Sequence, residues 1–186
     1  MELCHKRDIP LYDYTLEDFE QDVKTIDKLW PEIQAALADL ALVRQLFGQL
    51  LIPEAVFREV VVNGEGQPGA KEVGEAAGDW IQIVRVEDTQ RVASIQERIG
   101  LQAGESEAIV LTRQLQIGTI LLDDRLAVLE AETQRLSVVR TPALYLAAKR
   151  AGLIERVKPK LDSLRSSGFY LRDEHYRAIL QRAEEL

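Results

Sequence analysis

The sequence predicts an α/β fold in which a mainly parallel sheet is flanked by helices in three layers. Short apolar runs at 50–52, 80–86, 119–122 and 137–140 alternate with helical patterns of about 10–15 residues. The length of 186 residues suits one domain, and 46% hydrophobic residues are enough to build its core. We therefore expect a globular domain rather than a disordered or fibrous chain.

The first part of the chain predicts two helices, a strand and a third helix. Apolar residues at helical spacing predict an amphipathic helix over 15–30, and a second helical pattern runs over 33–47 and stops at Gly48. The apolar run 50–52 predicts a strand, which leads into a helix over 54–62.

The middle of the chain predicts a loop, a buried strand and three helices. Glycine and proline mark a loop over 63–69, and a short helix is expected over 70–77. A buried strand is expected over 80–86, followed by helices over 88–99 and 104–116.

The last part continues the alternation of strands and helices. Strands are expected over 119–122 and 137–140, with a helix between them. Thr141 and Pro142 have the residue types of an N-cap and a first helical position, so another helix should begin there. Terminal helices are expected over 159–167 and 173–185.

The charge is unevenly distributed along the chain. Residues 1–32 carry nine acidic and four basic residues, whereas residues 140–182 carry ten basic and four acidic ones. One interpretation is an ordinary solvated helical surface. The other is a phosphate-binding face that the acidic N-terminal segment covers.

Five acidic residues lie at positions that could contribute to a ligand site, two of them after a predicted strand and three on predicted helices. Asp123 and Asp124 come directly after the strand 119–122, at the edge of a parallel sheet where ligands bind. Glu105 and Glu107 lie near the start of a helix. Glu107 shares a stripe with Leu111 and Leu115, whereas Glu105 lies in the first turn, where the helix dipole favours an acid for structural reasons. Glu59, on the helix after the strand 50–52, would by itself be taken for a solvated residue.

Carboxylates from several strand–helix units form a ligand set for a hard divalent cation. Oxygen ligands suit Mg²⁺ or Mn²⁺, and the near absence of His and Cys disfavours zinc. Such sites commonly serve phosphodiester hydrolysis, because the cation lowers the pKa of a bound water.

Other site types lack their required context. Gly64, Gly66 and Gly69 match G-x-G-x-x-G but do not follow a strand, so dinucleotide binding is disfavoured. His5 and His175 lie in terminal segments, and the chain has no G-x-S-x-G elbow for a nucleophilic serine. No apolar run is long enough to span a bilayer, so we expect a cytoplasmic protein without a membrane partner.

From residue 35 to about residue 180 the chain resembles the PIN-domain proteins related to VapC-type toxins. The order and spacing of the matching motifs carry this resemblance. They are LALVRQLFGQLLIPEAVFRE (40–59), GEGQPGA (64–70), WIQIV (80–84), GESEAIVL (104–111), TILLDDR (119–125), AKRAGLI (148–154) and the SGF of 167–169.

This resemblance implies a Mg²⁺- or Mn²⁺-dependent ribonuclease that acts on RNA and is neutralised by an antitoxin. By position, Glu59, Glu107 and Asp124 match acidic residues of the PIN site, with Glu105 and Asp123 as their neighbours. The family also implies a homo-oligomer, such as a dimer.

The chain departs from the family at its beginning. PIN domains open with an apolar strand that ends in an Asp, and no such strand precedes the match. Asp27 falls near that position, within a segment of helical periodicity. Residues 1–30 instead resemble the C-terminal tail of the partner antitoxins, so we expect an antitoxin-like helical segment over 1–31 and a PIN-like domain over 32–186.

Three functions remain open from the sequence. The leading hypothesis is an active toxin-type ribonuclease with Glu59, Glu107 and Asp124 as its metal ligands. The second is a catalytically degenerate PIN-like module whose N-terminal segment binds the domain, within one chain or in a second copy. The third is a receiver or other small-ligand α/β domain that uses Asp123 and Asp124 as an acidic phosphate-handling pocket.

Overall fold

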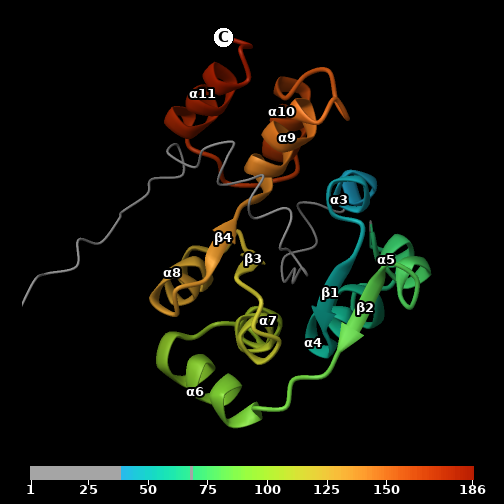
Figure 1. The fold of residues 1–186 in the computed structure, drawn as a ribbon, viewed down its shortest axis with the longest axis vertical. Helices are drawn as coiled ribbons and strands as arrows, with labels where there is room; N and C mark the ends of the chain where they lie inside the picture. The colour runs from blue at the N-terminus through green and yellow to red at the C-terminus, as the bar shows by residue number, and fades with distance from the viewer. Residues whose placement is uncertain (1–38, 68) are drawn as a thin grey trace, which may run out of the picture.

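The computed structural model describes residues 39–67 and 69–186, in which helices alternate with four short strands (Figure 1). The predicted helix over 15–30, the antitoxin-like segment and the domain boundary at residue 31 lie outside these residues. The elements are α3 (Leu40–Phe47), β1 (Leu50–Pro53), α4 (Glu54–Phe57), the π-helix η2 (Arg58–Val62), α5 (Ala70–Ala76), β2 (Ile81–Val84), α6 (Thr89–Ile99), α7 (Ala103–Gln114), β3 (Thr119–Leu121), α8 (Arg125–Thr133), β4 (Ser137–Val139), α9 (Thr141–Arg150), α10 (Lys158–Ser166) and α11 (Asp173–Arg182).

The strands of the described residues form two separate parallel pairs. In one pair Leu50 of β1 lies opposite Ile81 of β2, and in the other Thr119 of β3 lies opposite Ser137 of β4. α7 packs against both β1 and β3, and Figure 1 shows the two pairs on either side of this helix. The parallel strands were predicted correctly, but the described residues do not join them into one sheet.

Apolar clusters on both sides of the strands show that the two pairs belong to one layered structure. On one side Leu51 of β1 shares a cluster with Ile120 of β3 and with side chains of α6, α7 and α8. On the other side Leu50 of β1 shares a cluster with Leu121 of β3 and with residues of α3, α5 and α9. The strands therefore form the middle of three layers, as predicted.

A third apolar cluster holds the C-terminal helices on α3 and α9. It contains Leu42 of α3 and Tyr145 of α9, together with Leu161 of α10 and Leu180 of α11. Burial and the nearby carboxyl of Asp39 raise the pKa of Tyr145 well above its ordinary value. This cluster places the basic C-terminal part of the chain beside the ends of β3 and β4.

Most predicted elements are found within one or two residues of their expected bounds. The helix expected over 173–185 ends earlier, at Arg182, and of the helix expected over 33–47 the structure describes Leu40–Phe47. Three other predictions also differ from the structure. The strand over 80–86 is shorter, and its Gln82 and Ile83 side chains are exposed, so the prediction of a buried strand was wrong. The helix over 54–62 changes to π-helical hydrogen bonding at Arg58. Thr141 is the first residue of α9 rather than its N-cap, and its hydroxyl donates to Asp123.

Glycine residues end two of the helices. Gly48 ends α3 with φ of 74°, and Gly100 ends α6 with the same positive φ, a conformation that favours glycine. None of the helices in the described residues is long and apolar enough to cross a membrane.

Candidate functional site

Glu59 and Glu107 lie on the contact between α4–η2 and α7. Oε2 of Glu107 accepts a hydrogen bond of 3.0 Å from the backbone N–H of Ala55, at the start of α4. One turn later, Oε2 of Glu59 lies beside Gly104 in the first turn of α7, only 3.0 Å from where a Cβ at residue 104 would be. The two helices therefore run past each other with an acidic side chain at each end of their contact.

Glycine at residue 104 permits this close approach. A Cβ there would also lie 3.1 Å from Cγ2 of Val56, so the backbone of α7 reaches α4 because residue 104 has no side chain. The helices could otherwise not bring Glu59 against the start of α7.

Asp124 forms the N-cap of α8, directly after β3. Its Oδ1 accepts hydrogen bonds of 2.7 Å from the N–H of Leu126 and 2.9 Å from the N–H of Ala127. The sequence prediction of Asp124 at the end of a strand is confirmed. The cap uses one carboxylate oxygen, and within the described residues the other accepts no hydrogen bond from the protein.

Asp123 is buried and joins the end of β3 to the start of α9. Its Oδ1 accepts a hydrogen bond of 3.0 Å from the N–H of Thr141, and its Oδ2 accepts a short hydrogen bond from the Thr141 hydroxyl. Arg140 donates 2.6 Å to the Asp123 carbonyl and lies 3.8 Å from its carboxylate. Burial raises the pKa of Asp123 although these partners oppose the shift.

Glu105 has a structural role within α7. Its carboxylate accepts a hydrogen bond of 3.0 Å from the N–H of Gln102 and forms the capping box of the helix. This is the first-turn role that the sequence suggested. Asp27, the remaining predicted ligand, lies outside the described residues.

These residues have the side-chain chemistry that binds a divalent cation, but they are not gathered at one place. Carboxylate oxygens are the ligands that Mg²⁺ and Mn²⁺ prefer. Yet no three acidic, His or Cys side chains within residues 39–67 and 69–186 come together in a group that could hold a metal. Glu59 and Glu107 lie at one helix contact and Asp123 and Asp124 at the end of β3, so the described residues alone do not complete a metal site.

A pocket between α9 and α11 lies next to this acidic region. Its lining is mostly apolar, with cationic Arg140 and Arg182 and the ring of His175. Arg140 belongs both to this pocket and to the hydrogen bonds around Asp123. The apolar and aromatic lining comes from Pro142, Ala143, Leu146, Phe169, Tyr170, Leu171, Ala178 and Ile179.

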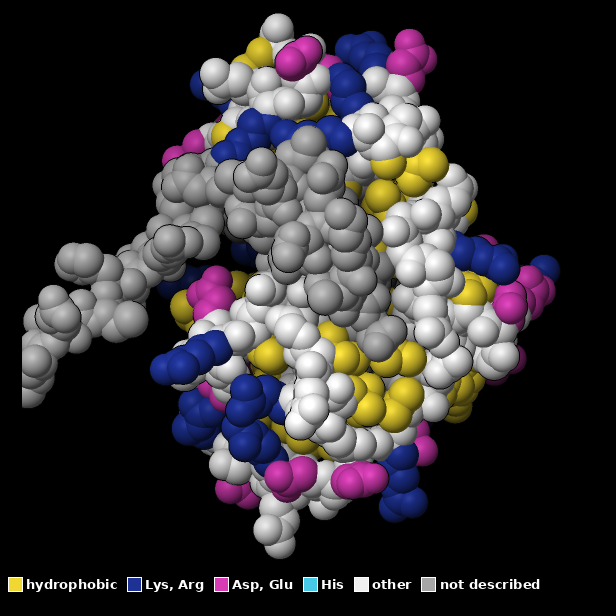
Figure 2. All heavy atoms as spheres, in the orientation of Figure 1, with side chains coloured by type: hydrophobic (Ala, Val, Ile, Leu, Met, Phe, Trp, Pro, Cys, Tyr) yellow, Lys and Arg dark blue, Asp and Glu magenta, His cyan; other side chains and the backbone are white. Residues whose placement is uncertain are grey.

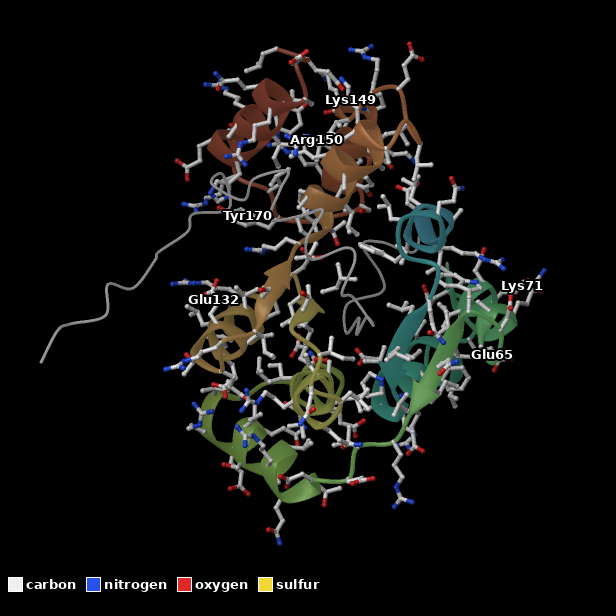
Figure 3. All side chains as sticks on the ribbon, viewed as in Figure 1. Glu65, Lys71, Glu132, Lys149, Arg150 and Tyr170 are labelled. Atoms are coloured by element: carbon white, nitrogen blue, oxygen red, sulfur yellow. The ribbon has the colours of Figure 1, made fainter. Side chains whose placement is uncertain are left out.

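Basic side chains surround the end of the molecule that holds this pocket. Figure 2 shows Lys and Arg side chains gathered near α9 and α11, and a second basic group at the end formed by α6 and α8. Figure 3 shows Tyr170 below α11, on the opposite side of the molecule from Glu65 and Lys71; its side chain is 84% exposed. Burial and the charge of Arg172 lower the pKa of His175, which favours a neutral ring at the pocket.

Sequence reasoning missed Gly104, Arg140 and Thr141 as residues that shape the site. Thr141 was seen as a helix start, but its bond to Asp123 spans 18 residues and has no local signal. A sequence signal did exist for Gly104, since glycine in the first turn of a helix has low intrinsic propensity and commonly marks a close contact.

The comparisons with known proteins give one finding. A family model described as a PIN domain matches residues 34–185, which is most of the chain. No curated protein matches, and no solved structure matches. The match covers every described element from α3 to α11.

Proposed function

Because the chain belongs to the PIN-domain family, we propose that it is a toxin-type endoribonuclease that depends on Mg²⁺ or Mn²⁺ and belongs to a toxin–antitoxin pair. The position of Glu59 and Glu107 on one helix contact, between α4–η2 and α7, carries this proposal. Asp124, with one carboxylate oxygen outside its cap bonds, supplies the third acid after β3.

In this proposal Glu59, Glu107 and Asp124 hold the cation, with Asp123 and Glu105 as supporting neighbours. A bound divalent cation supplies an activated water and stabilises negative charge on a phosphodiester. Since the described residues bring no three such groups together, the proposal requires a further oxygen ligand from residues 1–38. Asp27 is our prediction for that ligand.

The basic C-terminal part of the chain would hold the RNA backbone. Arg140 lies beside Asp123 and also lines the pocket of α9 and α11, so a phosphate bound there would lie near the end of β3. Arg172 and Arg182 extend the positive charge along α11. Contacts of this kind position a nucleic acid without reading its sequence.

RNA cleavage in the presence of Mn²⁺ tests this function. The wild-type chain should cut single-stranded RNA, whereas Glu107→Gln and Asp124→Asn should lose cleavage and remain folded. These replacements keep a side-chain oxygen that can accept the hydrogen bonds of Ala55 and of the α8 cap. Arg125→Gln, which changes an exposed charge beside Asp124, serves as the matched control. Equal cleavage by all four proteins would contradict the assignment of the site.

A second candidate function is an interaction module that has lost catalysis. The mostly apolar pocket with Arg140 and Arg182 suits an amphipathic acidic helix, and the predicted helix over 15–30 has apolar Phe19 and Val23 on one stripe. The antitoxin-like segment 1–31 would bind this pocket, in its own chain or in a second copy, which would account for a homo-oligomer.

Charges introduced on the apolar stripe of the segment test the second candidate. Phe19→Asp with Val23→Asp should release the segment and expose the pocket to a fluorescent apolar probe. Where the segment binds a second copy, the oligomeric state seen by light scattering should change too, and Glu20→Asp should change neither. An oligomeric state that is the same in all three proteins, with the pocket still accessible to a fluorescent apolar probe, would contradict this binding mode.

A further inference from the structure

The pocket between α9 and α11 extends along one face of α11. Its lining residues His175, Ala178, Ile179 and Arg182 are three or four positions apart, so their side chains lie on one side of this helix. From His175 to Arg182 the helix rises by about 10 Å. The pocket is therefore a groove along α11, with His175 towards one end and Arg182 towards the other.

Two relationships between α9 and α11 show which end of the groove faces the acidic residues. Lys149, in the last turn of α9, donates 2.6 Å to the carbonyl of Ala183, directly after α11. At the other end, burial and the charges of Arg172 and Arg140 lower the pKa of His175, so Arg140, which precedes α9, lies near this ring. The two helices therefore run in the same direction. The His175 end of the groove lies beside Arg140 and the acidic end of β3.

The middle of the groove is apolar and aromatic. Leu146 of α9 and Ile179 of α11 line it and are only partly buried, so apolar surface remains accessible there. Phe169 and Tyr170, between α10 and α11, add two aromatic rings. Phe169 packs against the third apolar cluster, whereas Tyr170 is 84% exposed and belongs to none of the clusters in the described residues. The ring of Tyr170 is therefore accessible to a planar ligand.

We propose that this groove binds one nucleotide of a single-stranded RNA, with the base stacked on Tyr170 and the flanking phosphates at Arg140 and Arg182. Two cations on either side of an apolar stretch match the alternation of phosphate and base along an RNA strand. Unpaired bases stack on aromatic side chains whatever their identity, so this contact does not require a particular sequence. The inference rests on the proposed RNA substrate and names the place where one of its bases binds.

The position of the groove favours RNA over an acidic peptide helix as its occupant. Arg140 lines the groove and also donates 2.6 Å to the carbonyl of Asp123, the residue before Asp124. An RNA strand in the groove therefore continues towards the carboxylates that we propose as cation ligands. A peptide helix would meet the same arginines, but its binding does not account for this continuity.

Binding of RNA without divalent cations tests the groove in the full chain. The first probe is a fluorescently labelled single-stranded RNA of mixed sequence, followed by anisotropy in EDTA. The second is inorganic polyphosphate, followed by calorimetry, which carries phosphate charge without bases. Tyr170→Ala should weaken RNA binding at least about fivefold, as expected for the loss of one stacked base, and leave polyphosphate binding unchanged. Tyr170→Phe keeps an aromatic ring and should bind RNA like the wild type.

The charged end of the groove is tested by a second pair of variants. Arg182→Gln should weaken the binding of both probes and make RNA binding less dependent on salt, because one phosphate contact is lost. Lys71→Gln is the matched control: it removes an exposed charge on the opposite side of the molecule from Tyr170 (Figure 3) and should bind both probes like the wild type. Thermal unfolding reports whether each variant is folded.

The outcomes separate this inference from the proposed ribonuclease activity. RNA binding in a protein that does not cleave, weakened by Tyr170→Ala, would support the groove and contradict the activity. Cleavage together with unchanged RNA binding by Tyr170→Ala would support the activity and overturn the groove. Equal loss of both probes in Tyr170→Ala would also overturn it. So would a wild-type chain that binds no RNA; a changed oligomeric state of Tyr170→Ala in that case would indicate a protein segment in the groove.

Discussion

The carboxylate of Asp123 accepts two hydrogen bonds from Thr141, one from its backbone N–H and one from its hydroxyl, and they connect the end of β3 to the start of α9. Arg140 adds a bond of 2.6 Å to the Asp123 carbonyl. This connection holds the two consecutive strand–helix units together at the edge where Asp124 lies. It also links the acidic end of β3 to the pocket between α9 and α11.

Thr141→Val should lower the free energy of unfolding by about 2 kcal/mol, because the buried carboxylate loses its hydroxyl donor. The same change should raise the pKa of Asp123 further, since this hydrogen bond opposes the effect of burial. Denaturant unfolding measures the first effect and carbon-13 NMR titration the second. Thr141→Ser keeps the hydroxyl and is the control; equal losses in both variants would contradict the role of this bond.

Gly104→Ala should destabilise the protein by about 1–2 kcal/mol, although alanine is the better helix former. Its Cβ would lie 3.0 Å from Oε2 of Glu59 and 3.1 Å from Cγ2 of Val56. Gly74→Ala in α5 is the matched control: its Cβ meets only Cγ1 of Val61, at 3.4 Å, so this variant should be about as stable as the wild type or more stable. Thermal unfolding of the two variants decides, and a stabilised Gly104→Ala protein would contradict the close contact.

Glu185 should make the fold sensitive to acid. Its side chain is almost buried, which opposes ionisation, but hydrogen bonds from Lys149, Val157 and Lys158 lower its pKa to about 2. Because the folded pKa lies below the ordinary value of 4.5, the ionised group stabilises the fold above about pH 4.5, and this stabilisation is lost as the pH falls towards 2.

Glu185→Gln should therefore lower the free energy of unfolding by about 2 kcal/mol at pH 7 and by much less near pH 2. Unfolding curves across this pH range measure the difference. The exposed Glu132→Gln is the control and should change little at any pH. A difference for Glu185→Gln that stays constant with pH would show that its charge is not the cause.

The two functions of Asp124 can be separated by two substitutions. Asp124→Ala removes the cap bonds to Leu126 and Ala127 and should cost about 1 kcal/mol of stability, whereas Asp124→Asn keeps the cap and should cost only a few tenths. Circular dichroism during thermal unfolding distinguishes them. If Asn destabilises as much as Ala, the charge at the α8 N-terminus rather than the hydrogen bonds holds the cap.

Local sequence signals predicted most helices and strands. They did not predict contacts between residues that are far apart in the sequence. Gly48 and the apolar run beginning at Leu50 have strong local signals, so the end of α3 and the position of β1 were predicted correctly. Ile83 is exposed in β2, which has β1 as its strand partner in the described residues, and composition does not reveal this exposure. The same limit explains why Asp123 was expected near a metal, while the structure ties it to Thr141.

The acidic site shows the same division. Glu107 and Asp124 were placed correctly on a helix and after a strand. The N-cap of Asp124 is a local role that an Asp before a helix commonly takes, whereas the bond between Glu107 and Ala55 depends on the packed structure. Glu59 carried no signal of its own apart from the family resemblance. Its place beside Gly104 is set by the approach of two helices that are far apart in sequence.

Calorimetric titration with Mn²⁺ tests most directly whether Glu59, Glu107 and Asp124 hold a cation. The account predicts binding by the wild-type chain that is lost in Glu107→Gln and in Asp124→Asn, both of which should stay folded, and retained in Arg125→Gln. Absence of Mn²⁺ binding in the wild type, or equal binding in all four proteins, would contradict the metal site and leave the interaction module as the better account of this domain.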